Sequence, residues 1–212
     1  MMLDCQRDKF NLPEDVTYLN CAYMGPLPKA SEKAGHIGVS EKCTPFQYFP
    51  PHFFDPAEKL KSTYAQLINC PDSQRIAPIP SVSYGVANVT NNFLLKPKEN
   101  VVLAGEQFPS NVYPWMNLVK KAGATLKMVE PPADAQNRGA AWNQQIMDAI
   151  DGNTRAVALA NVHWADGTRF DLKAIREKAH ANNACLLYTS DAADDGVRVG
   201  VGGRGGGGAG GG

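Results

Sequence analysis

The chain has 212 residues, of which 43% are hydrophobic and 20% charged, a composition typical of a globular protein with a substantial core. Its 21 Lys and Arg residues balance 21 Asp and Glu residues, so charge gives no reason to expect a nucleic acid or an anionic membrane as partner. No apolar run approaches the roughly 20 residues that span a bilayer. Residues 1–10 carry charges and lack the apolar core of a secretory signal. We therefore expect a cytoplasmic protein.

Five cysteines lie far apart in the chain and include no Cys-x-x-Cys pair. They are Cys5, Cys21, Cys43, Cys70 and Cys185. This spacing favours neither a disulfide scaffold nor a zinc site, and no other metal site is expected. We expect the thiols to be buried as small apolar side chains.

The first 75 residues are predicted to form an N-terminal helical segment. An extended stretch at Tyr18–Tyr23 precedes a Gly-Pro-Leu-Pro turn and a helix over about residues 29–42. A second helix is expected to begin at Asp55, with a proline at its first position. The aromatic-rich segment Pro45–Phe54 is expected to be a loop. It lines a ligand pocket or a subunit interface, or it covers the core.

Residues 76–184 alternate short apolar runs with amphipathic segments, which is typical of an α/β fold with a mostly parallel sheet flanked by helices. The expected strands are Arg75–Ile79, Asn100–Ala104, Thr125–Glu130 and Arg155–Val162. The expected helices are Tyr84–Leu95, Ser110–Ala122, Ala141–Ile150 and Asp171–Asn182. Asp171 is a good N-cap, and the helix that it begins should lead into another buried strand.

Residues 185–212 have an unusual composition, because 11 of the 20 glycines lie in Gly196–Gly212. Such a segment is expected to be disordered. The preceding Cys185–Asp195, CLLYTSDAADD, resembles the in-frame translation of a sequencing-library adapter. We therefore expect the natural sequence to end near Ala184 and residues 185–212 to be a disordered, non-native tail. The alternative is a genuine Gly-Arg tail that contacts RNA.

A candidate phosphate site lies in Pro80–Phe93, PSVSYGVANVTNNF, which follows a predicted strand and opens a predicted helix. Small hydroxyl residues at such a turn expose N–H groups at the positive end of the helix dipole. The segment has neither the P-loop lysine nor the G-x-G-x-x-G of dinucleotide-binding folds. It is a phosphate site or an ordinary capped helix.

Two more strand ends carry candidate site residues. In Leu103–Trp115, Phe108 lies near the carboxyl edge of the sheet, where ligands of open α/β sheets bind and where an aromatic ring can stack on a planar ligand. In Asn161–Leu172, a strand delivers His163 and Trp164 into a Gly turn. The alternatives are a core phenylalanine and an Asp-Gly turn that serves geometry alone.

Together with YLNCAYMGPLP at Tyr18–Pro28, these segments resemble the class V branch of the fold-type-I pyridoxal-phosphate enzymes. That branch includes cysteine desulfurases, selenocysteine lyases, kynureninases and isopenicillin-N-epimerase-like proteins. The likeness runs from about Tyr18 to Ala184, in order and spacing. It implies part of the large domain of that fold, pyridoxal 5'-phosphate as cofactor, an amino acid substrate, and a homodimer with the site at the subunit interface.

The resemblance assigns cofactor contacts to Ser83 and Tyr84, which match the family's phosphate-binding turn. Tyr84 stands where a threonine is common, so the hydroxyl of Ser81 or Ser83 is expected to substitute for it. Phe108 falls where the family places an aromatic residue, often histidine, over the cofactor ring. A phenylalanine can stack but cannot carry a proton, which argues against desulfurase-like chemistry.

His163, with Trp164, occupies the region where the family often has an asparagine that reaches the phenolic oxygen of the cofactor, and His163 is assigned that contact. The N-terminal segment lies near the substrate in the family, which assigns Asn20 and Tyr23 to substrate binding.

Two residues that the family needs have no credited counterpart. The aspartate that pairs with the pyridine nitrogen should follow the strand after Ala184. Asp191 lies near that spacing, but within the adapter-like segment. The Schiff-base lysine lies further on in the family and is missing here. We therefore expect an inactive fragment of a pyridoxal-phosphate enzyme that acts at the α-carbon of an amino acid. The alternative is a non-catalytic α/β module that binds a phosphorylated small molecule.

Overall fold

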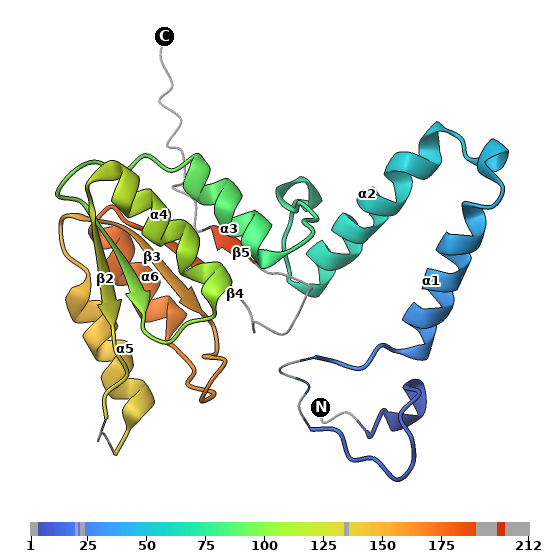
Figure 1. Ribbon diagram of the computed structural model, residues 1–212, viewed down its shortest axis with the longest axis horizontal. Coiled ribbons are helices and arrows are strands. Elements are labelled where there is room, and N and C mark those ends of the chain that lie inside the picture. The colour runs from blue at the N-terminus through green and yellow to red at the C-terminus, as the bar shows by residue number, and fades with distance from the viewer. Residues whose placement is uncertain (1–3, 20, 22–23, 134–135, 190–198, 202–212) are drawn as a thin grey trace. The chain divides into compact units, whose positions relative to one another are not determined.

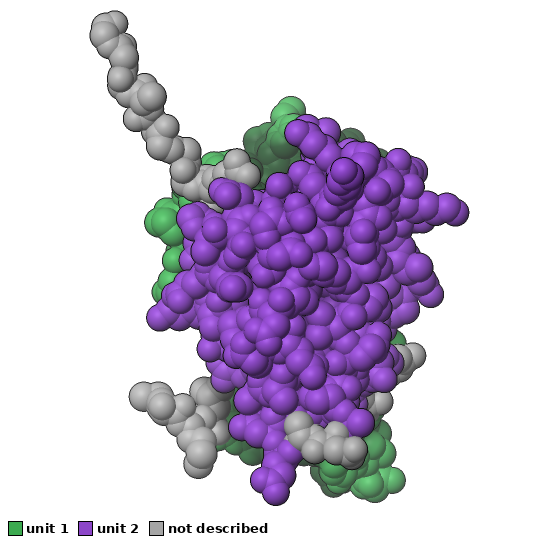
Figure 2. Space-filling view, turned by 90° about the vertical axis from the view of Figure 1, so that its left-hand side faces the viewer, with its two compact units in different colours: residues 1–79 green, residues 80–212 purple. Residues whose placement is uncertain are grey.

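The computed structural model describes the chain except at residues 1–3, 20, 22–23, 134–135, 190–198 and 202–212. The chain divides into two compact units, residues 1–79 and residues 80–212, which are distinguished by colour in Figure 2. The division falls at the end of Arg75–Ile79, the segment expected to be the first strand.

The first unit is helical. Its elements are η1 (Arg7–Lys9), α1 (Lys29–Glu41), η2 (Pro45–Gln47), α2 (Pro50–Leu67) and η3 (Ser73–Arg75). The helix α2 begins earlier than the expected Asp55, so the prediction of a loop is wrong for residues 50–54. Pro50 and Pro51 occupy the first two helical positions, where a missing N–H leaves no hydrogen bond unmade. The His52 ring accepts the Phe49 N–H at 2.8 Å and fixes this end of the helix.

The second unit is an α/β sandwich, and it confirms the predicted fold class. Its helices are α3 (Val82–Asn91), η4 (Pro109–Asn111), α4 (Tyr113–Ala122), α5 (Arg138–Ala149) and α6 (Leu172–Ala181). Its strands are β1 (Asn100–Ala104), β2 (Thr125–Val129), β3 (Thr154–Ala160), β4 (Cys185–Thr189) and β5 (Val199–Val201). The order is β2-β1-β3-β4-β5, with β1 to β4 parallel and β5 antiparallel to β4 (Figure 1).

Helices cover both faces of this sheet, which is why β1 is buried at every position. On one face α3, α4 and the residue before α4 pack through Val86, Val112, Trp115 and Val119 onto Val101, Leu103, Ala156, Ala158 and Leu187. On the other face α5 and α6 pack through Trp142, Ile146, Ile175 and Ala179 onto Val102, Ala104, Val157, Leu159 and Leu186. None of the helices in the described part of the chain is long and apolar enough to cross a membrane.

The expected strand at Arg75–Ile79 is wrong. The 3₁₀ turn η3 ends at Arg75, and residues 76–79 pair with no described strand. Pro78 and the following Pro80 have no N–H to donate to a ladder, and a strand interior tolerates this poorly.

The strand β4 confirms the buried strand expected after α6, and it contradicts disorder for residues 185–189. It pairs with β3 from Ala156↔Cys185 to Ala160↔Thr189. The neighbouring Leu186 and Leu187 bury their side chains on opposite faces, and this burial holds the strand in place. Residues 199–201 form β5, which pairs with β4 and contradicts disorder there. Residues 190–198 and 202–212 of the predicted tail lie outside the described residues.

The five cysteines are free thiols. None of them is buried, so the predicted burial is wrong. Cys5, Cys21 and Cys43 are exposed.

The amino end of the sheet is held by a polar network around Asp151. The Asp151 carboxylate accepts hydrogen bonds from Asn100 Nδ2 at 3.0 Å and from Lys127 Nζ at 2.7 Å. Thr154 Oγ1 donates to Asn100 Oδ1 at 2.8 Å, so β1, β2 and β3 are linked through side chains. The hydrogen bonds from Lys127 and Asn100 outweigh burial and hold the pKa of Asp151 well below its ordinary value.

This network makes a prediction for Asp151→Asn. The substitution should lower the free energy of unfolding at pH 7 by about 1 kcal/mol, a modest loss because the Asp151 side chain is 48% exposed. Because the folded-state pKa lies below the unfolded one, the carboxylate stabilises the fold above about pH 4, and its contribution disappears as the pH falls further. Urea unfolding at pH 7 and pH 3 measures both effects.

The control is Asp148→Asn, which makes the same charge change on an exposed site of α5. If Asp151→Asn lost no more unfolding free energy at pH 7 than Asp148→Asn does, the role of the network would be contradicted.

Candidate functional site

The path of the chain defines a switch point in the second unit. After β1 the chain passes to α4 on one face of the sheet, and after β3 it passes to α6 on the other face. The two strands are neighbours. Ligands of open α/β sheets bind at the carboxyl ends of strands where the connections change face in this way. The loops that follow β1 and β3 therefore carry the candidate site.

The loop Gly105–Phe108, which follows β1, is anchored from within the protein. The buried Gln107 donates its Nε2 to the Ala158 carbonyl at 2.9 Å, and its Oε1 accepts from Asn111 at 2.9 Å. These bonds tie the loop to β3 and to η4. Phe108, the next residue, is 41% exposed.

The start of the same loop is pressed against the end of β2. The Gly105 N–H donates to the Val129 carbonyl at 2.8 Å, and a Cβ on Gly105 would overlap the Glu130 carboxylate. Glu106 then adopts a left-handed conformation, with φ of 50°. This conformation is unfavourable for a residue other than glycine, so the contacts around the loop must maintain it.

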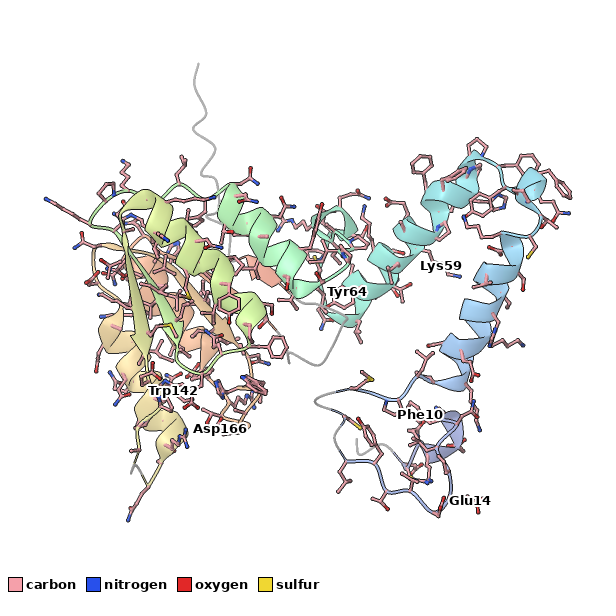
Figure 3. All side chains as sticks on the ribbon, viewed as in Figure 1. Phe10, Glu14, Lys59, Tyr64, Trp142 and Asp166 are labelled. Atoms are coloured by element: carbon pink, nitrogen blue, oxygen red, sulfur yellow. The ribbon has the colours of Figure 1, made fainter. Side chains whose placement is uncertain are left out.

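His163, at the other side of the switch point, is only 1% exposed. Its Nε2 lies 3.3 Å from the Gly105 carbonyl, and its Nδ1 lies 3.2 Å from an Asp166 oxygen. Its ring centroid is 4.9 Å from that of Trp142. Trp142 and Asp166, which both lie near this ring, are labelled in Figure 3. Nε2 thus faces a backbone carbonyl, whereas the buried Nδ1 makes no hydrogen bond with the described residues although the Asp166 carboxylate is near. The assignment of His163 to the cofactor stays a prediction.

Asp166 and Gly167 form a tight turn that supports His163. The Gly167 N–H donates to the His163 carbonyl at 2.9 Å, and the Asp166 carboxylate accepts the Thr168 N–H at 3.0 Å. Arg138 lies 3.3 Å from the same carboxylate. Burial opposes ionisation of Asp166, but the hydrogen bonds from Thr168 and the charges nearby prevail and lower its pKa. The polar groups of this turn therefore have a structural role.

Trp164, next to the buried histidine, is 50% exposed. Its Nε1 donates to the Glu106 carbonyl at 2.7 Å. Its ring meets that of Phe108 at a centroid distance of 5.7 Å and an interplanar angle of 89°. Trp164 thus connects the loops after β1 and β3. The sequence identified the His163-Trp164 pair, but it carries no signal for which of the two side chains is buried.

The N-terminus of α3 has free donors. The Ser81 hydroxyl caps the helix by accepting the Tyr84 N–H at 3.2 Å, and the Ser81 carbonyl accepts the Gly85 N–H. The first N–H groups of a helix have no intrahelical acceptor, and within the described part of the chain no acceptor pairs with those of Val82 and Ser83, at the positive end of the helix. Ser81 is the capping hydroxyl, and Ser83 is exposed.

Ser83 and Phe108 line one groove between α3 and α4, with a volume of about 610 Å³. Polar side chains also line it, among them Ser110 of η4 and Lys121 of α4. The structure therefore brings together the predicted phosphate residue Ser83 and the predicted ring residue Phe108. Tyr84 is 57% exposed and is not part of the lining. The predicted substrate residues Asn20 and Tyr23 lie outside the described residues.

Comparison with known proteins identifies the family. The model of the aminotransferase class-V family matches residues 50–196, more than half of the chain, and the chain belongs to this family. A probable cysteine desulfurase of Borreliella burgdorferi is 22% identical over 179 residues, which cover 82% of this chain and 39% of the relative. A cysteine desulfurase of Enterobacter sp. (strain 638) is 25% identical over 133 residues, 61% of this chain and 32% of the relative.

Solved structures share the fold. The cysteine desulfurase CsdA of Escherichia coli superposes with a TM-score of 0.70 at 20% identity, over 86% of this chain and 47% of that chain. A C-DES mutant with glycine covalently linked to its PLP cofactor gives a TM-score of 0.73 at 17% identity, over 90% and 50%. The chain thus spans half or less of the length of each of these four proteins, and the predicted family and fold are confirmed.

The Asp-Gly turn after β3 yields a second prediction. Gly167 has φ of +72°, and a Cβ there would meet no atom within 4 Å, so Gly167→Ala is penalised by backbone conformation alone. We expect the free energy of unfolding to fall by about 1 kcal/mol. Gly152→Ala is the matched control, because Gly152 is equally open and lacks a positive φ. Equal stability of the two variants in urea unfolding would refute the conformational requirement.

Proposed function

We propose that this chain holds pyridoxal 5'-phosphate in the groove between α3 and α4, as part of a class V enzyme that acts at the α-carbon of an amino acid. The observation that carries the proposal is that Ser83, at the N-terminus of α3, and Phe108, after β1, line the same groove. Family membership and the fold shared with PLP-containing C-DES support it.

The phosphate would bind at the N-terminus of α3. The N–H groups of Val82 and Ser83 and the helix dipole favour an anion with several acceptor oxygens. The Ser81 cap organises this end without occupying those two donors. Because these donors belong to the backbone, a tyrosine at position 84 in place of a threonine leaves them in place.

The cofactor ring would lie against Phe108, which offers a partly exposed aromatic face beside the switch point. When bound, the cofactor supplies an electron sink for the carbanion that forms at the substrate α-carbon. Phe108 holds no titratable proton, so its part is to orient the ring. This argues against transferring the desulfurase reaction of the named relatives to this chain.

The proposed enzyme needs residues beyond those that form the groove. In the family that the sequence resembles, a lysine bonds the cofactor, and no lysine of the 212 residues occupies its place. We propose that this chain alone binds the cofactor without turning over amino acids. Asp191, near the spacing of the family's ring-nitrogen aspartate, lies outside the described residues. Homodimerisation of the intact protein is likewise proposed from the resemblance.

A second candidate function is a non-catalytic module that binds phosphorylated small molecules. It is favoured by the same free N–H groups at the start of α3, because backbone donors recognise phosphate whatever group carries it. The two functions differ in the ring contact, which only the first assigns to Phe108.

A thermal-shift experiment distinguishes them. Ligand binding to the native state raises the melting temperature by mass action. We expect pyridoxine 5'-phosphate, which has the cofactor's ring and phosphate but no aldehyde, to protect the chain more than inorganic phosphate or pyridoxine at the same concentration. In Phe108→Ala its protection should fall to that of inorganic phosphate.

Equal protection by inorganic phosphate and pyridoxine 5'-phosphate in the wild type would favour the second function. Protection by none of the ligands would overturn both. With pyridoxal 5'-phosphate and amino acids we expect neither turnover nor a lysine-linked absorbance band, and turnover would contradict the inactivity proposed for the chain alone.

A further inference from the structure

We propose that Trp164 is a positioning residue, which clamps the loop after β1 and thereby sets the orientation of the Phe108 ring. Its indole reaches from the loop after β3 to the loop after β1, with a hydrogen bond to the Glu106 carbonyl and an edge-to-face contact with Phe108. The clamp itself is a property of the described structure. Its effect on ligand affinity rests on the proposed function.

The loop needs such a clamp because of its backbone. Glu106 is a non-glycine residue with φ of 50°, a conformation that persists only where neighbouring groups hold it. Trp164 donates to the carbonyl of this same residue at 2.7 Å. The Gln107 side chain holds the loop from inside the protein, whereas Trp164 holds it from the exposed side.

Trp164 can act as a clamp because its own backbone is fixed. The preceding His163 is buried, and its N–H donates to the Thr168 carbonyl at 2.8 Å. The His163 ring packs on Trp142, and its Nε2 faces the Gly105 carbonyl. The indole of Trp164 therefore projects from a rigid turn, although half of its surface is exposed.

The consequence concerns the ring of a ligand and not its phosphate. Aromatic pairs prefer the near-perpendicular arrangement that Phe108 and Trp164 adopt, so Trp164 favours one orientation of Phe108. A ring that is already oriented loses less conformational entropy when a planar ligand stacks on it. The donors at the start of α3 belong to a different element, and removal of Trp164 should leave them unchanged.

Two variants separate the parts of the clamp. Trp164→Phe keeps an aromatic ring but removes the N–H, and Trp164→Ala removes both. Hydrogen–deuterium exchange should be faster at residues 105–108 in both variants than in the wild type, with the larger increase in Trp164→Ala. Exchange in β1 should not change. Unchanged exchange at residues 105–108 in both variants would overturn the clamp, and this arm needs no ligand.

Affinity measurements test the effect on the ring. Titration calorimetry with pyridoxine 5'-phosphate should show binding to Trp164→Ala weakened about fivefold or more, while the affinity for inorganic phosphate stays within about twofold. In a Phe108→Ala background, Trp164→Ala should weaken pyridoxine 5'-phosphate no further, because Trp164 acts through Phe108.

Equal loss of affinity for both ligands, or a full additional loss in the Phe108→Ala background, would overturn positioning through Phe108. A wild type that does not bind pyridoxine 5'-phosphate would overturn the proposed function, and the exchange experiment would still decide the clamp.

Discussion

Two neighbouring parallel strands, β1 and β3, are followed by connections to opposite faces of the sheet, and this change of face determines where the chain can bind a ligand. The chain leaves β1 for the helix on one face and leaves β3 for the helix on the other, so the loops at their carboxyl ends diverge above the sheet. The start of α3 reaches the same groove, which Ser83 lines together with Phe108. Donors for an anion and an aromatic surface thus come to one groove from segments far apart in the sequence.

Side chains near the switch point divide into two groups. Gln107 and His163 are buried and face backbone carbonyls, so they fix the loops. Ser83, Phe108 and Trp164 keep exposed surface and are the side chains that a ligand can meet. For Gln107 this follows from the energetics of burial, since a buried amide needs protein partners and is then unavailable to a ligand. It also explains how an exposed tryptophan can be held by a turn whose interior is closed to solvent.

Much of the fold was predictable from local pattern. The strand β1 has the bounds that its apolar run predicts, and Asp171 caps α6 as predicted. The strand expected at Arg75–Ile79 failed because two prolines outweigh its apolar residues, and α2 begins early because prolines suit a first helical turn. In the site, the pairing of Ser83 with Phe108 follows from topology. The burial of His163 beside an exposed Trp164 depends on packing against Trp142, which no local pattern contains.

The most direct test of the binding groove is NMR spectroscopy of the ¹⁵N-labelled chain during titration with pyridoxine 5'-phosphate. The proposed site predicts the largest amide shifts at Val82 and Ser83, the donors at the start of α3, together with shifts of the Phe108 ring protons. Inorganic phosphate should reproduce the shifts at the two amides and not those of the ring. Shifts confined to other parts of the chain, or no shifts at saturating ligand, would contradict the assignment of the groove to the cofactor.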